Sequence, residues 1–166
     1  MSPIRLGTKF SIEDYIQEND MSYPVWWDTT ITIYNKYEDA QTQLVKWYRH
    51  TLSNCFWKAS NNKVTINDTV LDSSNILCRI PKDGRYLDKY EWEALPNDQM
   101  EDYFTLGADD IIIKGAIDFE VDEYTKGKRS SDLLEKYKLY GCMQIEQFSV
   151  NVGAGRNNEH YLVMGT

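Results

Sequence analysis

The sequence has few of the residues that form disulfides, zinc sites and catalytic dyads, with three cysteines and two histidines in 166 residues. Cys55, Cys78 and Cys142 are odd in number and lack CxxC spacing, so we interpret them as small buried side chains. His50 and His160 have no acidic or histidine residue at ligand spacing, and we interpret both as structural residues. A nucleophilic pair of Cys142 with His160 is the alternative left open.

Long apolar runs are also missing. No stretch approaches the roughly 20 apolar residues that a membrane-spanning helix needs. The first five residues, Met1-Ser2-Pro3-Ile4-Arg5, lack the apolar segment of a signal peptide. We therefore expect neither membrane insertion nor secretion.

Sequence motifs of catalysis and cofactor binding are absent, including GxSxG, HExxH and the Walker pattern. The glycine-rich stretch 153–158 superficially resembles a phosphate cradle, but a strand-like stretch follows it where a helix would be needed, which favours a hairpin loop. We expect no catalytic residue, no cofactor and no metal ion. The alternative is a metal-dependent nuclease or hydrolase that uses carboxylates of Asp109, Asp110, Glu120 and Asp122.

Positive charge is scarce as well, with 18 basic against 26 acidic residues and a net charge of −8. This balance argues against DNA binding by phosphate neutralisation. Residues 83–123 hold thirteen acidic and three basic residues, a net charge of −10, which leaves +2 for the rest of the chain. Such a block is either a solvated face or a surface that repels an anion or docks a cation. The one basic run, Lys126-Gly127-Lys128-Arg129, is either a solvated turn or a contact to nucleic acid phosphate or to an acidic patch on a partner.

The sequence is rich in short stretches where polar and β-prone apolar residues alternate, the pattern of half-buried strands. Asn61-Asn62 predicts a tight turn, and Ser131 predicts the start of a short helix. We expect another short helix over residues 12–18. The alternation predicts strands at 30–35, 44–50, 54–60, 63–67, 76–80, 103–106, 110–114, 117–121, 143–150 and 160–164. This order predicts a mainly β fold, a small antiparallel β-barrel or sandwich with one or two short helices.

We expect two parts, an extended N-terminal arm over residues 1–28 and a single β-barrel domain over residues 29–166. The acidic residues at about 83–102 predict a long loop, and a loop of that length is usually functional. Aromatic residues in the arm and the loop either pack against the body or contact other subunits and partners. The candidate contact residues are Tyr23, Trp26, Trp27, Tyr86, Tyr90 and Trp92.

Several segments, taken in order, resemble a family of minor-capsid or head-completion proteins of Firmicutes phages, encoded between the portal and tail genes. The similarity covers about residues 29–166, and its force comes from the serial order of motifs that are individually weak. The sequence departs from the pattern in its longer arm and its acidic insertion. The resembling residues are Thr32-Ile33-Tyr34-Asn35-Lys36-Tyr37, then Trp47, Thr51 and Cys55-Phe56-Trp57, then Ile80-Pro81, then Asp110-Ile111-Ile112-Ile113-Lys114-Gly115, and finally Gly155-Arg156 and His160-Tyr161.

The resemblance implies a structural virion protein of the phage neck, a head-closure or head–tail connector that forms a homo-oligomeric ring, six- or twelve-fold. Its implied partners are other copies of itself, the portal or adaptor protein, and the tail terminator or tail tube protein. It implies a location in the virion, after assembly in the host cytoplasm, with no membrane partner.

A ring of this kind forms part of the DNA channel, and an acidic wall lets DNA pass without sticking and without sequence recognition. We expect part of the acidic segment to face that channel. The candidate channel-facing residues are Glu91, Glu93, Asp98, Glu101 and Asp102. The alternatives are a tail terminator or other tail component and, from different classes, a small acidic binding module or a metal-dependent phage enzyme.

Overall fold

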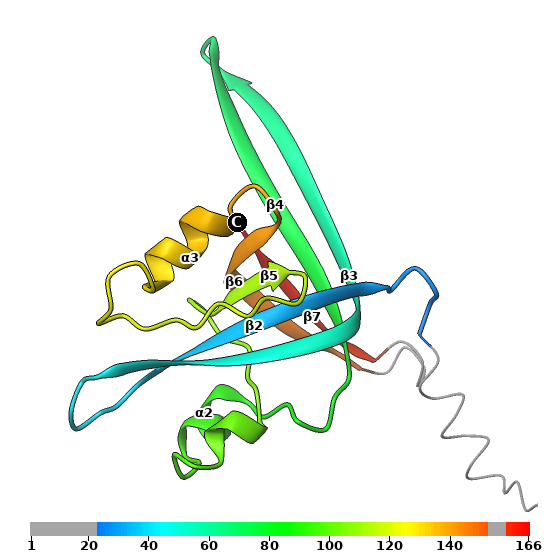
Figure 1. Cartoon of the computed structure of the whole chain (residues 1–166). Coiled ribbons are helices and arrows are strands. Elements are labelled where there is room, and N and C mark those ends of the chain that lie inside the picture. Colours follow the sequence, from blue (N-terminus) through cyan, green and yellow to red (C-terminus); the bar gives the residue numbers. More distant parts are fainter. Residues whose placement is uncertain (1–22, 153–158) are drawn as a thin grey trace, which may run out of the picture.

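The computed structural model describes residues 23–152 and 159–166, which form a closed antiparallel β-barrel (Figure 1). The order of strands around the barrel is β2-β3-β4-β7-β6-β5, and every neighbouring pair is antiparallel. This confirms the predicted mainly β class, with a barrel as its architecture. The strands are β2 (Thr29–Glu38), β3 (Val45–Ile66), β4 (Thr69–Pro81), β5 (Ile111–Lys114), β6 (Cys142–Asn151) and β7 (His160–Gly165).

Strand β3 closes one side of the barrel because it pairs with two different strands. Its first part, through Cys55, pairs with β2, and the rest, from Phe56, pairs with β4. The β2–β3 register shifts at this point, and Asn54 has a φ of 59°, a left-handed conformation that asparagine tolerates. A bulge of this kind bends a strand, so β3 can leave β2 and continue beside β4.

Strand β6 makes the opposite corner in the same way. It pairs with β5 through Gln144 and with β7 from Ile145 on, with a register shift between Ile145 and Gln147. Gly165 of β7 lies at this corner, opposite both Ile145 and Ile76 of β4. A Cβ on Gly165 would overlap the backbone carbonyl of Gln144, so only glycine permits this approach of the two strands.

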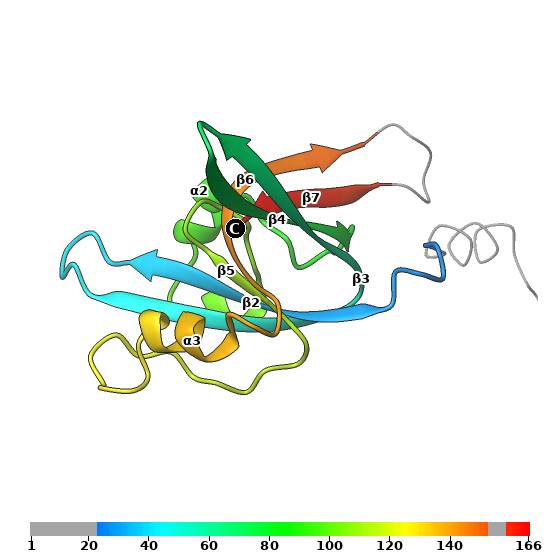
Figure 2. The same cartoon turned by 90° about the horizontal axis from the view of Figure 1, so that it is seen from above.

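Three short helical segments cover the two faces of the β2–β3 hairpin. Helix α2 (Lys89–Glu93) and the 3-10 helix η1 (Met100–Asp102) lie on one face, and helix α3 (Ser130–Tyr137) lies on the other (Figures 1 and 2). Alternation along β3 explains this arrangement. Tyr48 packs with Trp92 of α2, whereas its neighbour Trp47 packs in the cluster that contains Leu133 of α3.

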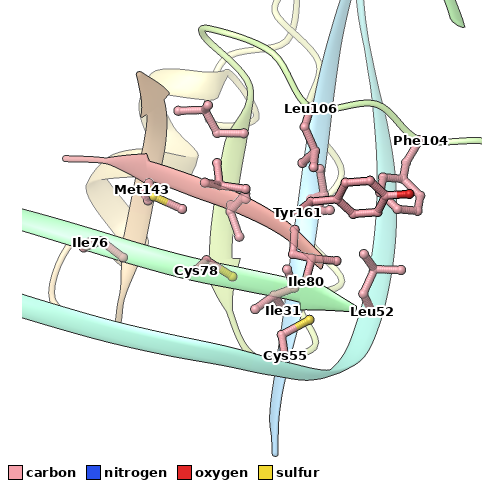
Figure 3. Packing of buried hydrophobic residues seen from close by; sticks show 14 residues of the cluster. Ile31, Leu52, Cys55, Ile76, Cys78, Ile80, Phe104, Leu106, Met143 and Tyr161 are labelled. Atoms are coloured by element: carbon pink, nitrogen blue, oxygen red, sulfur yellow. The ribbon is translucent and has the colours of Figure 1, made fainter. Parts of the chain in front are cut away.

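The interior of the barrel is filled by aliphatic, aromatic and sulfur-containing side chains that come from every strand (Figure 3). Ile31 and Ile33 of β2 meet Cys78 and Ile80 of β4 across this core, and all four are almost completely buried. Burial explains the alternating patterns, because one side of each strand faces this apolar interior.

Several predicted elements differ from the structure. The turn predicted at Asn61-Asn62 is wrong, because β3 continues to Ile66 and turns at Asn67 and Asp68, both with positive φ. The stretches 103–106 and 117–121 are not strands. The first contributes Phe104 and Leu106 to the barrel core, and the second packs alternate side chains on the α3 cluster without pairing as a strand. The predicted helix 12–18 and loop 153–158 lie outside the described residues.

The corner at Gly165 gives a direct test of barrel closure. Gly165→Ala should lower the free energy of unfolding by about 2–3 kcal/mol, because the new Cβ forces two paired strands apart. Gly84→Ala is the matched control, since a Cβ there meets nothing and stability should stay within about 0.5 kcal/mol. Chemical denaturation measures both, and equal stabilities of the two variants would contradict the proposed constraint.

Candidate interaction surfaces

A buried carboxylate joins the acidic segment to the barrel. Asp110 is completely buried directly before β5. Its carboxylate accepts hydrogen bonds from the backbone N–H of Lys36 at 2.9 Å, the backbone N–H of Gly107 at 3.1 Å and the Nδ2 of Asn35 at 3.0 Å. The Nζ of Lys89 lies 3.8 Å away. This one side chain therefore ties β2, the turn before β5 and helix α2 together.

Asn35 completes the connection from the barrel side. Its Nδ2 also donates to the carbonyl of Thr105 at 2.6 Å, and its Oδ1 accepts from the backbone N–H of Thr105 at 3.2 Å. Lys89 donates to the carbonyl of Lys36 at 2.9 Å. Each buried polar group of Asn35 thus has a partner, as burial requires.

Burial is the dominant influence on the Asp110 carboxyl and raises its pKa to about 6. The Lys89 ammonium and the hydrogen bonds from Lys36, Asn35 and Gly107 act in the opposite direction, since they favour the ionised form. The carboxylate is thus ionised at neutral pH and holds its donors, which offset only part of the desolvation cost.

The stretch 83–102, which we call the acidic lobe, contains the short helical segments α2 and η1 and has a small core of its own. Asp88 caps α2 by accepting from the backbone N–H of Glu91 at 2.9 Å. Trp92 is completely buried, stands edge-on to Tyr48, and donates its Nε1–H to the carbonyl of Tyr103 at 3.0 Å. The lobe therefore presents a fixed surface.

The candidate contact aromatics divide into buried and exposed groups. Trp92 and Trp27 are buried within the protomer, and Tyr86 is partly buried against the rings of Phe104, Phe148 and Tyr161. These three side chains therefore pack against the chain's own body. Tyr90 is 84% exposed and Trp26 is 63% exposed, so both are available for contact.

The described end of the arm is docked on the barrel by aromatic packing. Trp27 stacks on Tyr23 with ring centroids 5.2 Å apart and meets the His160 ring edge-on at 5.4 Å. The hydroxyl of Tyr23 donates to the carbonyl of Glu159 at 2.7 Å and accepts from the backbone N–H of Lys82 at 3.1 Å. A groove of about 940 Å³ runs beside these residues.

All five candidate channel-facing residues are exposed on the outside of the acidic lobe: Glu91, Glu93, Asp98, Glu101 and Asp102. Only Glu93 has a lysine within 4 Å among the described residues, with Lys89 at 3.8 Å. The lobe therefore presents carboxylates that the protomer leaves largely unneutralised.

The hairpin of β3 and β4 extends beyond the barrel, and we call residues 60–75 the ribbon (Figure 1). Within the described residues, β2 pairs with β3 only through Cys55 and β7 pairs with β4 only from Ile76, so both ribbon edges lack a strand partner. Ile66 and Val70 flank its turn and are 52% and 58% exposed. The sequence pattern did not reveal this surface. Alternation of polar and apolar residues shows which side of a strand is buried, but not where the neighbouring strand ends.

Residues 124–140, which we call the basic lobe, form the surface around α3. The lobe holds five basic and two acidic residues. Leu139 and Tyr140 are exposed beside the lysines, and both were missed from the sequence because nothing in their spacing separates them from core residues. Lys126, Lys128 and Arg129, singled out from the sequence, lie in this lobe and form no ion pair within the described residues.

The candidate metal carboxylates do not converge. Asp110 is held inside the protein on the α2 face, whereas Glu120 pairs with Arg49 at 2.8 Å on the α3 face. Asp122 is engaged in its own turn by Thr125. Among residues 23–152 and 159–166, no group of three or more histidine, cysteine or acidic side chains is placed to hold a metal ion.

The nucleophilic pair of Cys142 and His160 is wrong. Cys142 begins β6, and His160 pairs with Asn151 at the far end of that ten-residue strand, so the two side chains do not meet. Burial raises the pKa of the Cys142 thiol to about 11 and that of Cys55 to about 12, and it also raises the pKa of Cys78. All three thiols are therefore protonated at neutral pH and act as packing groups.

The fold and its surfaces define a barrel module with a projecting ribbon and two charged lobes. The chain belongs to the family described as "Family of unknown function (DUF6751)", which matches residues 26–166. Comparison with curated proteins and with solved structures gave no match. Within the described part of the chain, none of the helices is both long and apolar enough to cross a bilayer.

The buried carboxyl predicts a specific pH dependence. Because the native pKa of Asp110 is raised to about 6 from about 4, the native state binds its proton more tightly than the unfolded state does. The free energy of unfolding should fall by on the order of 2–3 kcal/mol as the pH rises from about 4 to about 6, and this contribution should be constant above that range. Denaturation curves of the wild type and Asp110→Asn across this range measure the difference, and parallel pH profiles would contradict it.

The two aromatic residues of α2 form a matched pair for testing the core of the acidic lobe. Trp92→Ala should lower the free energy of unfolding by about 3–5 kcal/mol because it empties a fully buried site. Tyr90→Ala should change it by less than about 0.5 kcal/mol because that ring is exposed. Urea denaturation compares them, and a neutral Trp92→Ala would mean that the lobe is held without its core.

Proposed function

We propose that the protein is a structural subunit of the neck of a tailed bacteriophage, a ring-forming head-closure or head–tail connector protein. In this role it joins the portal or adaptor protein to the tail terminator or tail tube protein and surrounds the DNA channel. The protein acts in the virion after assembly in the host cytoplasm, without an enzymatic activity. The serial order of the motifs that resemble head-completion proteins supports the role, and so does the barrel fold that this resemblance implies.

The observation that carries the proposal is the ribbon. A two-stranded hairpin is marginally stable in water by itself, and unpaired strand edges are sites for pairing with another chain. The ribbon combines two free edges with exposed apolar residues at its turn. These properties fit a segment that is completed by a neighbouring protein in an assembly.

Charge supports passage of DNA through such a ring. The exposed carboxylates of the acidic lobe have little neutralisation within the protomer, and a negative wall does not bind the phosphate backbone. Sequence-independent passage requires no base-reading groups. Exposure makes these carboxylates available to the channel or to a subunit contact.

The proposed connector role can be tested by electron microscopy. The purified protein is imaged alone and mixed with the portal protein encoded in the same genome. We expect rings that stack coaxially on the portal or its adaptor. Rings that bind only the tail tube would assign the protein as a tail terminator. A persistent monomer that ignores the portal would overturn the proposal, and tight binding of such a monomer to a basic protein would favour an acidic binding module.

The ribbon predicts a separation of assembly from folding. Ile66→Ser with Val70→Ser should weaken binding to the portal or tail partner by roughly tenfold or more, because apolar anchors at the turn are removed. The melting temperature should change little because both side chains are exposed in the protomer. Leu44→Ser, at an equally exposed position in the β2–β3 turn, is the control and should bind normally. Unchanged binding by the ribbon variant in pull-down titrations would exclude this contact.

A further inference from the structure

The acidic lobe and the basic lobe lie on opposite faces of the β2–β3 hairpin (Figures 1 and 2). The strand register requires this separation. Asn35 and Tyr48 are cross-strand partners whose side chains meet the α2 side, whereas Tyr34 packs with Leu133 on the α3 side. The two lobes therefore point away from each other in one protomer and cannot neutralise each other.

The charges of the two lobes are opposite. The acidic lobe has seven acidic and two basic residues, a net charge of −5, and the basic lobe has five basic and two acidic residues, a net charge of +3. Arg85 and Lys89 pair with carboxylates of their own surroundings, at 2.8 Å and 3.8 Å. In the described residues Lys126, Lys128 and Lys136 have no carboxylate oxygen within 4 Å, although the Lys128 ammonium adds to the hydrogen bonds from Thr125 and Tyr124 in lowering the pKa of Asp122.

Each lobe also exposes large apolar side chains among its charges. Tyr90 stands out from α2 in the acidic lobe, and Leu139 and Tyr140 are exposed after α3 in the basic lobe. Aromatic and aliphatic anchors surrounded by charged residues are the usual composition of a protein–protein contact. Like faces would repel, so a symmetric contact of two acidic or two basic lobes is disfavoured.

We propose that the acidic lobe of one copy of the chain docks on the basic lobe of the next copy. This inference rests on the proposed ring-forming function and identifies the contact between subunits. A head-to-tail contact uses two different surfaces of the same chain, and its repetition produces a closed ring when the rotation between copies closes. Tyr90 then meets the apolar patch of Leu139 and Tyr140, and lysines of the basic lobe meet Glu91 and Asp98.

Charge reversal tests the contact. One variant carries Glu91→Lys with Asp98→Lys, a second carries Lys126→Glu with Lys128→Glu, and a third carries all four changes. These side chains are exposed, so circular dichroism and melting temperature should match the wild type. Mass photometry and sedimentation velocity at about 0.1 M salt, where exposed charges still interact, measure self-association with and without the portal.

We expect each two-site variant to associate roughly 100-fold more weakly than the wild type, because like charges then face each other. The four-site variant should recover assembly, because its lobes are again opposite in charge. An equimolar mixture of the two-site variants should also recover it, since each then supplies the surface that the other lacks.

The outcomes separate this contact from the function on which it rests. The head-to-tail contact would be overturned if both two-site variants form rings as readily as the wild type, or if a folded four-site variant fails to assemble. Either result would leave the proposed connector role unaffected. A wild-type chain that stays monomeric with and without the portal would overturn both.

Discussion

The architecture depends on the buried contact of Asp110 with Asn35 and Lys89. A carboxylate without water is costly unless donors surround it, and here two backbone N–H groups, an amide and an ammonium do so. Since Asp110 immediately precedes β5, the contact sets this short strand beside β2. Since Lys89 belongs to α2, it also holds the acidic lobe against the hairpin. The surface charge of the lobe is consequently presented at a fixed orientation.

Barrel closure and the projecting ribbon have the same cause. β3 has 22 residues, but each neighbouring strand pairs with only part of it. The bulge at Asn54 turns the strand from one neighbour to the next, and the length that remains beyond the barrel becomes the ribbon. At the opposite corner, the absence of a side chain at Gly165 lets β7 lie close to β6 where the register of these two strands shifts. One corner thus produces a free hairpin, and the other produces a tight closure.

The sequence predicts the fold class because alternation records which side chains face an apolar interior. The prediction of individual strands fails where side chains alternate between buried and exposed but the backbone does not pair with another strand. Ile117, Phe119 and Val121 alternate like a strand, yet they pack on side chains of the α3 cluster without a backbone partner. In the acidic lobe, a helix of five residues is too short to show a helical period in the sequence. The many carboxylates around Trp92 make the segment resemble an exposed loop, although Trp92 is buried. The basic run at 126–129 is evident in the sequence, whereas Leu139 and Tyr140, which follow α3, were identified only from their exposure in the structure.

The acidic residues of the segment 83–123 lie in two different surroundings in the structure, which the composition alone does not show. Near α3 the carboxylates are engaged locally, since Glu120 pairs with Arg49, Asp122 closes its turn and Glu123 accepts from the Nε1–H of Trp47 at 2.9 Å. Of these three, Glu120 is neutralised by the Arg49 guanidinium, whereas the hydrogen bonds to Asp122 and Glu123 come from neutral groups and leave their negative charge in place.

The acidic lobe carries a net charge of −5 and the basic lobe one of +3, so the two faces of the hairpin present lobes of opposite sign. In a head-to-tail ring, carboxylates at the contact, such as Glu91, are neutralised by the next subunit and no longer repel DNA. A negative channel wall must then come from carboxylates outside that contact, and Glu101 and Asp102 of η1 are exposed and closer along the chain to the barrel. Under the proposed role, subunit contact and DNA passage therefore use different carboxylates of the acidic lobe.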